Sequence, residues 1–149
     1  MYQRILCPTD FSETSYEAVR TAVALAKAFN AELILLHVVV PVTPSPDVFV
    51  GVSFDPAEYE SALKAAAEPK LGQVAEKLVD RSLAPRLIVL SGQPAQMIEK
   101  CAADEKADLI VIATHGMTGW RHYLMGSVAQ KVVQHVSLPV LAVRGPKGS

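Results

Sequence analysis

Short apolar runs alternate with longer amphipathic segments along the chain. The runs are rich in β-branched residues and are bounded by turn residues, which is typical of strands. In the segments between them, apolar residues recur at helical spacing, which predicts helices with one buried face. This alternation indicates an α/β protein whose parallel sheet is covered on both faces. The predicted strands are 2–7, 31–38, 86–91, 107–113 and 140–143.

Residues that favour helix ends mark the predicted helix boundaries. The run Thr14–Glu17 has capping-box spacing and predicts the start of the first helix, which Asn30 is expected to end. Asp55-Pro56 predicts the start of a second helix that Pro69 kinks or splits. Ser127 is predicted to be the N-cap of the last helix.

The connection from 39 to 55 is too long for an ordinary loop in a compact domain. Pro41, Pro44 and Pro46 exclude regular structure from its first half, yet several apolar residues follow them. Three interpretations stay open: a loop folded back on its own domain, a lid over a ligand, or a segment that binds a partner.

Composition narrows the classes of function. The chain has 149 residues and a net charge of −1, and its lysines and arginines are scattered, so no nucleic-acid partner is expected. Its longest apolar run, 33–42, is interrupted by His37 and Pro41 and is too short to span a bilayer. We expect no membrane partner, no signal peptide and a cytoplasmic protein. The length predicts one domain, 1–144, with a frayed tail at 145–149.

Cys7 and Cys101 lie far apart and belong to no metal-binding motif. They are expected to be reduced, buried thiols, with a redox or metal role as the alternative. Two cysteines alone cannot build a closed zinc site, and the histidines and carboxylates show no metal-ligand spacing. No metal ligand is therefore predicted.

The segment after the strand 107–113 carries the strongest candidate chemistry. After the strand, the chain is expected to pass through a flexible loop that contains Gly116 and Gly119. Gly126-Ser127 then precedes a helix. A strand, a glycine-containing loop and a helix start place bare backbone N–H groups against a phosphate. Glycine lets the backbone approach the phosphate without an intervening Cβ.

The spacing resembles the nucleotide-binding element of the universal stress protein family, which reads Gly, two residues, Gly, nine residues, Gly and then Ser or Thr. The corresponding residues are Ala113, Gly116, Gly126 and Ser127, so three of the four positions match and alanine replaces the first glycine. Further similarities extend the resemblance over almost the whole chain, at Tyr2–Ser15, Leu35–Val38, Gly92–Pro94, Asp108–Gly116 and Leu138–Val140.

The resemblance implies a five-stranded parallel sheet of order 3-2-1-4-5, with helices on both faces, in the Rossmann-like fold of the adenine nucleotide α hydrolase-like proteins. In this order the winding reverses between strands one and four, which leaves a crevice at their carboxyl ends. The loops that line it would be Pro8–Asp10 and Ala113–Ser127.

By resemblance, this crevice is an ATP site of the family's ATP-binding, single-domain type. Phosphates would lie along the backbone near Gly116 and Gly126, and Asp10 and Val38 would face the ribose and adenine. Mg²⁺ would arrive with the nucleotide rather than in a cage of its own. The implied site residues are Pro8, Thr9, Asp10, Val38, Ala113, Thr114, His115, Gly116, Gly126, Ser127, Val128 and Ala129.

Several of these residues have a simpler alternative role. Asp10 could cap the approach to the first helix, His115 could satisfy loop carbonyls, and His37 is expected to be a hydrogen-bonded structural residue. Arg121 could reach a terminal phosphate or remain solvated. Ala113 would be disfavoured by about 1 kcal/mol at a positive φ and tolerated at a negative one.

The favoured function is a small cytoplasmic stress-response module that binds ATP and regulates an unknown protein partner. The alternatives are a slow ATPase and a nucleotide-independent interaction dimer. The chain lacks a complete Walker motif with its Lys-Ser/Thr pair, and no catalytic residue is assigned. The resemblance also implies a homodimer that pairs through the edge strand Val140–Val143.

Overall fold

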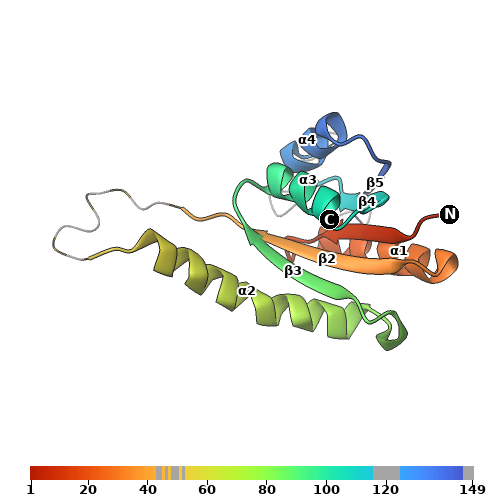
Figure 1. Ribbon diagram of the computed structural model, residues 1–149, viewed down its shortest axis with the longest axis horizontal. Coiled ribbons are helices and arrows are strands. Elements are labelled where there is room, and N and C mark those ends of the chain that lie inside the picture. The colour runs from red at the N-terminus through yellow and green to blue at the C-terminus, as the bar shows by residue number, and fades with distance from the viewer. Residues whose placement is uncertain (43–44, 46, 48–50, 52, 116–124, 146–149) are drawn as a thin grey trace.

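In the computed structural model, one parallel sheet has the predicted order β3-β2-β1-β4-β5 (Figure 1). The structure describes residues 1–42, 45, 47, 51, 53–115 and 125–145. The strands differ from the predicted ranges by no more than a residue or two; they are β1 (Arg4–Pro8), β2 (Glu32–Val39), β3 (Arg86–Ser91), β4 (Leu109–Ala113) and β5 (Val140–Val143). The helical elements are α1 (Glu13–Phe29), α2 (Pro56–Leu78), η2, a 3₁₀ turn (Arg81–Leu83), α3 (Pro94–Asp104) and α4 (Ser127–His135).

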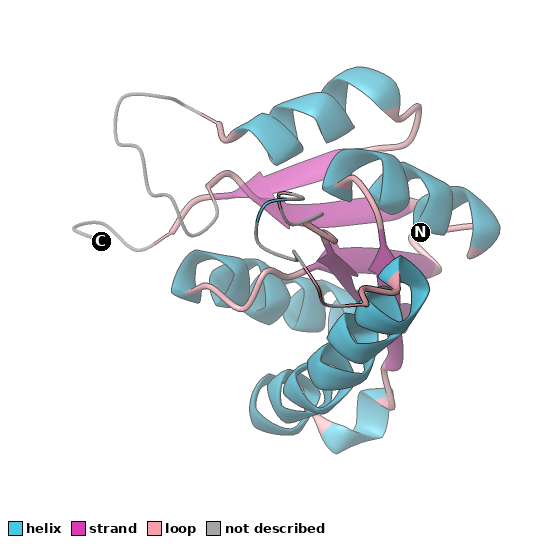
Figure 2. Ribbon diagram, turned by 90° about the vertical axis from the view of Figure 1, so that its left-hand side faces the viewer, coloured by secondary structure: helices cyan, strands magenta, loops and turns pink. Residues whose placement is uncertain are grey.

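Helices cover both faces of the sheet, as predicted (Figure 2). Successive residues of the central strands enter two separate core clusters, because side chains alternate between the faces of a strand. Ile5 packs into the cluster beneath α1 and α2, whereas Leu6 packs into the cluster beneath α3 and α4. Both side chains are fully buried. The uninterrupted apolar runs of the central strands are therefore explained by burial on two sides.

Two predicted helix starts are wrong. Ser12, not Thr14, caps α1, and its hydroxyl accepts a hydrogen bond from the Ser15 amide at 3.2 Å. Gly126, not Ser127, is the N-cap of α4, and Ser127 is the first helical residue. In both cases the N-cap is the residue that adopts the extended backbone before the helix, which propensity alone does not identify.

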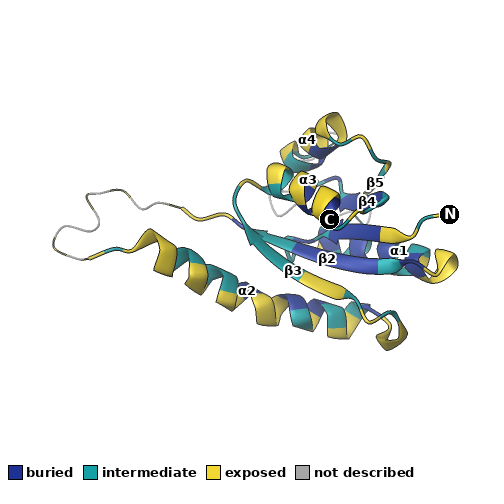
Figure 3. Cartoon of the chain, viewed as in Figure 1, coloured by how far each residue is buried: buried dark blue, intermediate teal, exposed yellow. Residues whose placement is uncertain are grey.

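The helix α2 starts as predicted, with the Asp55 carboxylate accepting from the Ala57 amide at 3.0 Å, but Pro69 does not split it. Proline removes the hydrogen bond to the carbonyl of Ala65, and both residues lie on the exposed side, where water can satisfy that carbonyl. Ala62 and Ala66 are exposed although both are apolar. Figure 3 shows the first half of α2 projecting beyond the sheet, with largely exposed side chains.

Both cysteine thiols are free and buried, as predicted. Burial raises the pKa of the Cys7 thiol well above its usual range and raises that of Cys101 to about 11. The reactive thiolate is thus suppressed at both positions. Among the described residues, no helix is long and apolar enough to cross a membrane. Much of the 39–55 connection, namely residues 43–44, 46, 48–50 and 52, lies outside the described part of the chain.

Candidate functional site

The carboxyl ends of β1 and β4 separate at the point where the sheet changes winding direction. These strands pair at Ile5–Leu109 and Leu6–Ile110, and the pairing stops there although β1 continues to Pro8 and β4 to Ala113. Over the same length β1 stays paired with β2, and β4 stays paired with β5. A switch point of this kind is where a ligand crevice is expected, at the carboxyl ends of β1 and β4.

Thr9 holds the shape of the first loop from inside. Its side chain is buried, and its hydroxyl lies 2.7 Å from the Ser15 hydroxyl while it accepts from the Phe11 amide at 3.1 Å. Its own amide donates to the Leu36 carbonyl at 2.8 Å, which ties the loop to β2. The Thr9 hydroxyl is thus hydrogen-bonded to other groups of the protein, and Thr9 follows Pro8 in this loop.

The Asp10 carboxylate shapes the start of α1. Its Oδ1 atom accepts a hydrogen bond from the Ser12 amide at 3.0 Å, one residue before the helix begins. This is the alternative role considered for Asp10, and it does not exclude ligand binding because a carboxylate offers two oxygens and about four acceptor positions. Asp10 lies two residues after the carboxyl end of β1.

Phe11 and His37 form a pair that the sequence interpretation missed. Phe11 has a φ of +67°, which is strained for an aromatic residue, and its ring stacks on His37 with centroids 4.2 Å apart. His37 Nδ1 is 2.8 Å from the Thr9 carbonyl, which confirms the predicted structural histidine. The register of the two strands explains why these residues are neighbours. Pro8 pairs with Leu36, so the next residues, Thr9 and His37, lie side by side.

Ala113 and Thr114 continue β4 into the second loop. Ala113 pairs with Val143 in the sheet, and it is not among the residues with a positive φ. Its methyl group is therefore tolerated without backbone strain. Thr114 is buried, its amide donates to the Val143 carbonyl at 2.8 Å, and its hydroxyl lies 3.1 Å from His115 Nδ1.

The start of α4 lies directly against this loop. The Gly126 amide donates to the Thr114 carbonyl, so that amide is already used within the protein. The first bond inside the helix runs from the Gln130 amide to the Gly126 carbonyl. The amides of Ser127, Val128 and Ala129 precede it, and no side chain of the described residues caps this end of α4.

Gly126 has little room for a side chain. A Cβ atom built there would lie 3.0 Å from the Thr114 carbonyl oxygen, which is tighter than nine in ten real Cβ contacts. Ser127 beside it is exposed, and Val128 is partly buried against the same core cluster as Val38. A close backbone approach and the amide donors of a helix start fit an anionic group such as a phosphate.

Some of the predicted site lies outside the described residues. This applies to Gly116 and also to Arg121, which was considered as a contact of a terminal phosphate. Within the described ranges, no group of three histidine, cysteine or carboxylate side chains could hold a metal ion.

The sheet order and the separation of β1 from β4 define an α/β protein of the Rossmann-like class, with its candidate site at the switch point. The model of the Universal stress protein family matches residues 1–144. Universal stress protein MJ0531 of Methanocaldococcus jannaschii is 38% identical over 152 residues, which cover 99% of this chain and 85% of the relative. This chain belongs to the universal stress protein family.

Solved structures show the same fold. The structure of protein MJ0577 has a TM-score of 0.80 and 32% identity, with 100% of this chain and 99% of that chain covered. A universal stress protein in complex with cAMP has a TM-score of 0.67 and 24% identity, with 96% and 97% covered. The Archaeoglobus fulgidus protein in complex with dAMP has a TM-score of 0.61 and 20% identity, with 95% and 98% covered.

Proposed function

We propose that this protein binds ATP in the crevice between β1 and β4 and acts as a nucleotide-dependent module of the stress response in the cytoplasm. The observation that carries the proposal is the start of α4, whose backbone amides lie beside the end of β4 and have no capping side chain among the described residues. It is supported by the two related proteins solved in complex with cAMP and dAMP, which are adenine nucleotides.

In the proposed site, the amides of Ser127, Val128 and Ala129 bind the phosphates, and the Ser127 hydroxyl and Gly116 complete the cradle. Asp10 and Val38 face the ribose and the adenine, with Pro8 and Thr9 as the wall. Thr114 and His115 border the phosphates. Mg²⁺ is carried by the nucleotide, which suits an ion that keeps several waters and prefers phosphate oxygens. Ala113 is compatible with this site because its position in β4 requires no positive φ.

The test is a nucleotide-release experiment followed by titration. Freshly purified protein is denatured, its supernatant is analysed by ion-pair chromatography, and stripped protein is titrated with Mg-ATP in a calorimeter. We expect saturable binding near one ATP per chain. At a hundredfold excess over Kd, ATP should raise the free energy of unfolding by about 2.7 kcal/mol.

The same samples separate the alternatives. ADP that accumulates beyond one equivalent per chain would identify a slow ATPase rather than a binding module. No released nucleotide and no heat at millimolar ATP would contradict the proposal and favour a nucleotide-independent interaction protein.

We also propose a homodimer that pairs through β5 (Val140–Val143). This strand is at the sheet edge, where Leu141 is 39% exposed, and an apolar edge of this kind is a template for pairing with a second copy.

Leu141→Lys should shift the mass measured by light scattering from dimer to monomer. The matched control is Leu87→Lys on the opposite edge strand β3, where Leu87 is 44% exposed. A monomeric native protein at micromolar concentration, or equal effects of both variants, would contradict this interface.

A further inference from the structure

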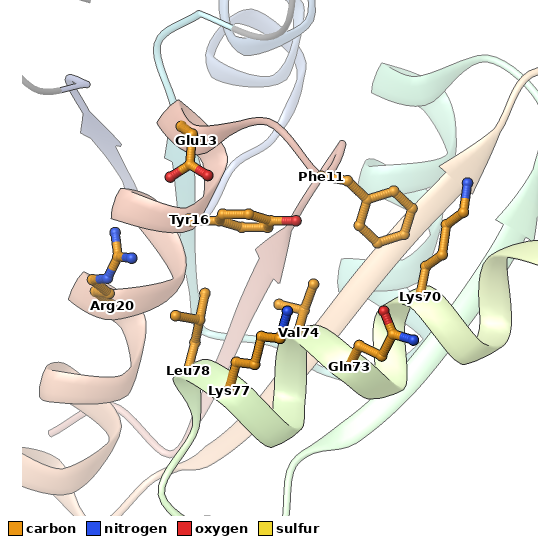
Figure 4. A pocket seen from close by; sticks show the side chains of 9 residues that line it. All are labelled: Phe11, Glu13, Tyr16, Arg20, Lys70, Gln73, Val74, Lys77 and Leu78. Carbon is orange, nitrogen blue, oxygen red and sulfur yellow. The ribbon is translucent and has the colours of Figure 1, made fainter.

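A second concave surface lies between α1 and α2, away from the start of α4. It is a groove of about 520 Å³ whose two walls are the facing sides of these helices (Figure 4). The spacing of the side chains is the same on each wall, at i, i+3 and i+7, because that spacing lines one side of a helix. The α1 wall consists of Glu13, Tyr16 and Arg20, and the α2 wall consists of Lys70, Gln73 and Lys77.

The floor of the groove is apolar. Val74 is buried and Leu78 is half-buried, and both pack with the core cluster between the helices and the sheet. The strained Phe11 lies at the end of the groove near the start of α1. Figure 4 shows the Tyr16 side chain directed into the groove, with its hydroxyl toward Phe11.

The α2 wall is cationic, although the chain as a whole has a net charge of −1. Neither Lys70 nor Lys77 has a carboxylate within 4 Å among the described residues, whereas the Arg20 guanidinium is paired with Glu17 on its own helix. Desolvation, then Glu13 and Asp10, raise the pKa of Tyr16, so its hydroxyl keeps its proton and can donate. The groove thus offers two lysines that have no ion-pair partner in the described part of the chain, above an apolar floor.

We propose that this groove docks an acidic amphipathic segment of a partner protein. Carboxylates of the segment pair with Lys70 and Lys77, and its apolar side chains cover Leu78, the half-buried part of the floor. Two helical walls with an apolar floor match the way in which amphipathic segments bind grooves. A nucleic acid fits less well, because polyanion binding uses many phosphate contacts and the groove is short.

The probe is a fluorescein-labelled amphipathic peptide of glutamate, leucine and alanine, and its binding to the full chain is followed by fluorescence anisotropy. The double variant Lys70→Glu/Lys77→Glu should bind it about tenfold more weakly, since each exposed pair contributes modestly and reversal adds repulsion. The matched control is Lys106→Glu/Lys131→Glu, which changes the net charge equally at exposed positions outside the groove. Circular dichroism checks that both variants are folded.

Four results would overturn the proposal. The first is no binding of the peptide by the native protein, and the second is an equal loss in the two double variants, which would indicate unspecific attraction. The third is equal affinity for a control peptide with glutamine in place of every glutamate. If light scattering shows instead that Lys70→Glu/Lys77→Glu changes the oligomeric state, the occupant is a second copy of this chain and the proposed partner is wrong. The proposal would be supported if added salt weakens binding of the peptide to the native protein, and if Lys70→Glu/Lys77→Glu weakens binding while the control variant does not.

Discussion

Gly126→Ala is expected to weaken Mg-ATP binding about tenfold, and Gly126→Val is expected to remove measurable binding. The added Cβ would lie 3.0 Å from the Thr114 carbonyl oxygen, which is backbone and cannot swing away. Relief requires the start of α4 or the end of β4 to shift, and overpacking of this kind typically costs about 1–3 kcal/mol. A loss of about 1.4 kcal/mol in binding corresponds to tenfold in Kd.

The measurement is calorimetric titration with Mg-ATP at a temperature where each variant is folded. Gly72→Ala is the matched control, because a Cβ at Gly72 meets no atom within 4 Å and this residue lies inside α2. That variant should bind ATP normally and be more stable by about 0.5–1 kcal/mol. If folded Gly126→Ala binds ATP as tightly as the native protein, the phosphates do not lie at the start of α4.

Alternating apolar runs and helical periodicity were sufficient to predict the strands and helices of this protein. The order of the strands came from the resemblance, because periodicity identifies strands without saying which are neighbours. The N-cap of α4 was predicted one residue late, since Ser127 has the higher capping propensity. The decisive bond joins the Gly126 amide to the Thr114 carbonyl, and a contact between loops is not visible in local sequence.

The candidate site shows the same division between what is local and what is not. The order of the strands places the loops after β1 and β4 together, and the sequence had marked both loops. The hydrogen bond between the Thr9 and Ser15 hydroxyls depends on how α1 packs against the loop that precedes it. The exposure of Ala62 depends on where the sheet ends beneath α2, which an amphipathic pattern does not reveal.

Asp108→Ala is expected to produce the largest loss of stability among these variants, about 2–4 kcal/mol in the free energy of unfolding. Its carboxylate accepts from the Gln3 amide at 2.8 Å and from the Arg4 amide at 3.0 Å. Its own amide donates to the Arg4 carbonyl at 2.9 Å. Hydrogen bonds to a charged group contribute about 1.5–3 kcal/mol each, and partial exposure places their sum toward the lower end.

This aspartate matters because β1 and β4 share so little pairing. Asp108 joins the amino ends of the two strands, and their carboxyl ends remain free to separate around the crevice. Urea unfolding provides the measurement, with Asp104→Ala as the control, since Asp104 pairs with Lys100 in an exposed position on α3 and its loss should change stability little. Asp108→Asn keeps one acceptor oxygen and should fall between the native protein and Asp108→Ala. Equal stabilities of the Asp108→Ala and Asp104→Ala variants would show that the backbone hydrogen bonds of the sheet, rather than this carboxylate, hold β1 beside β4.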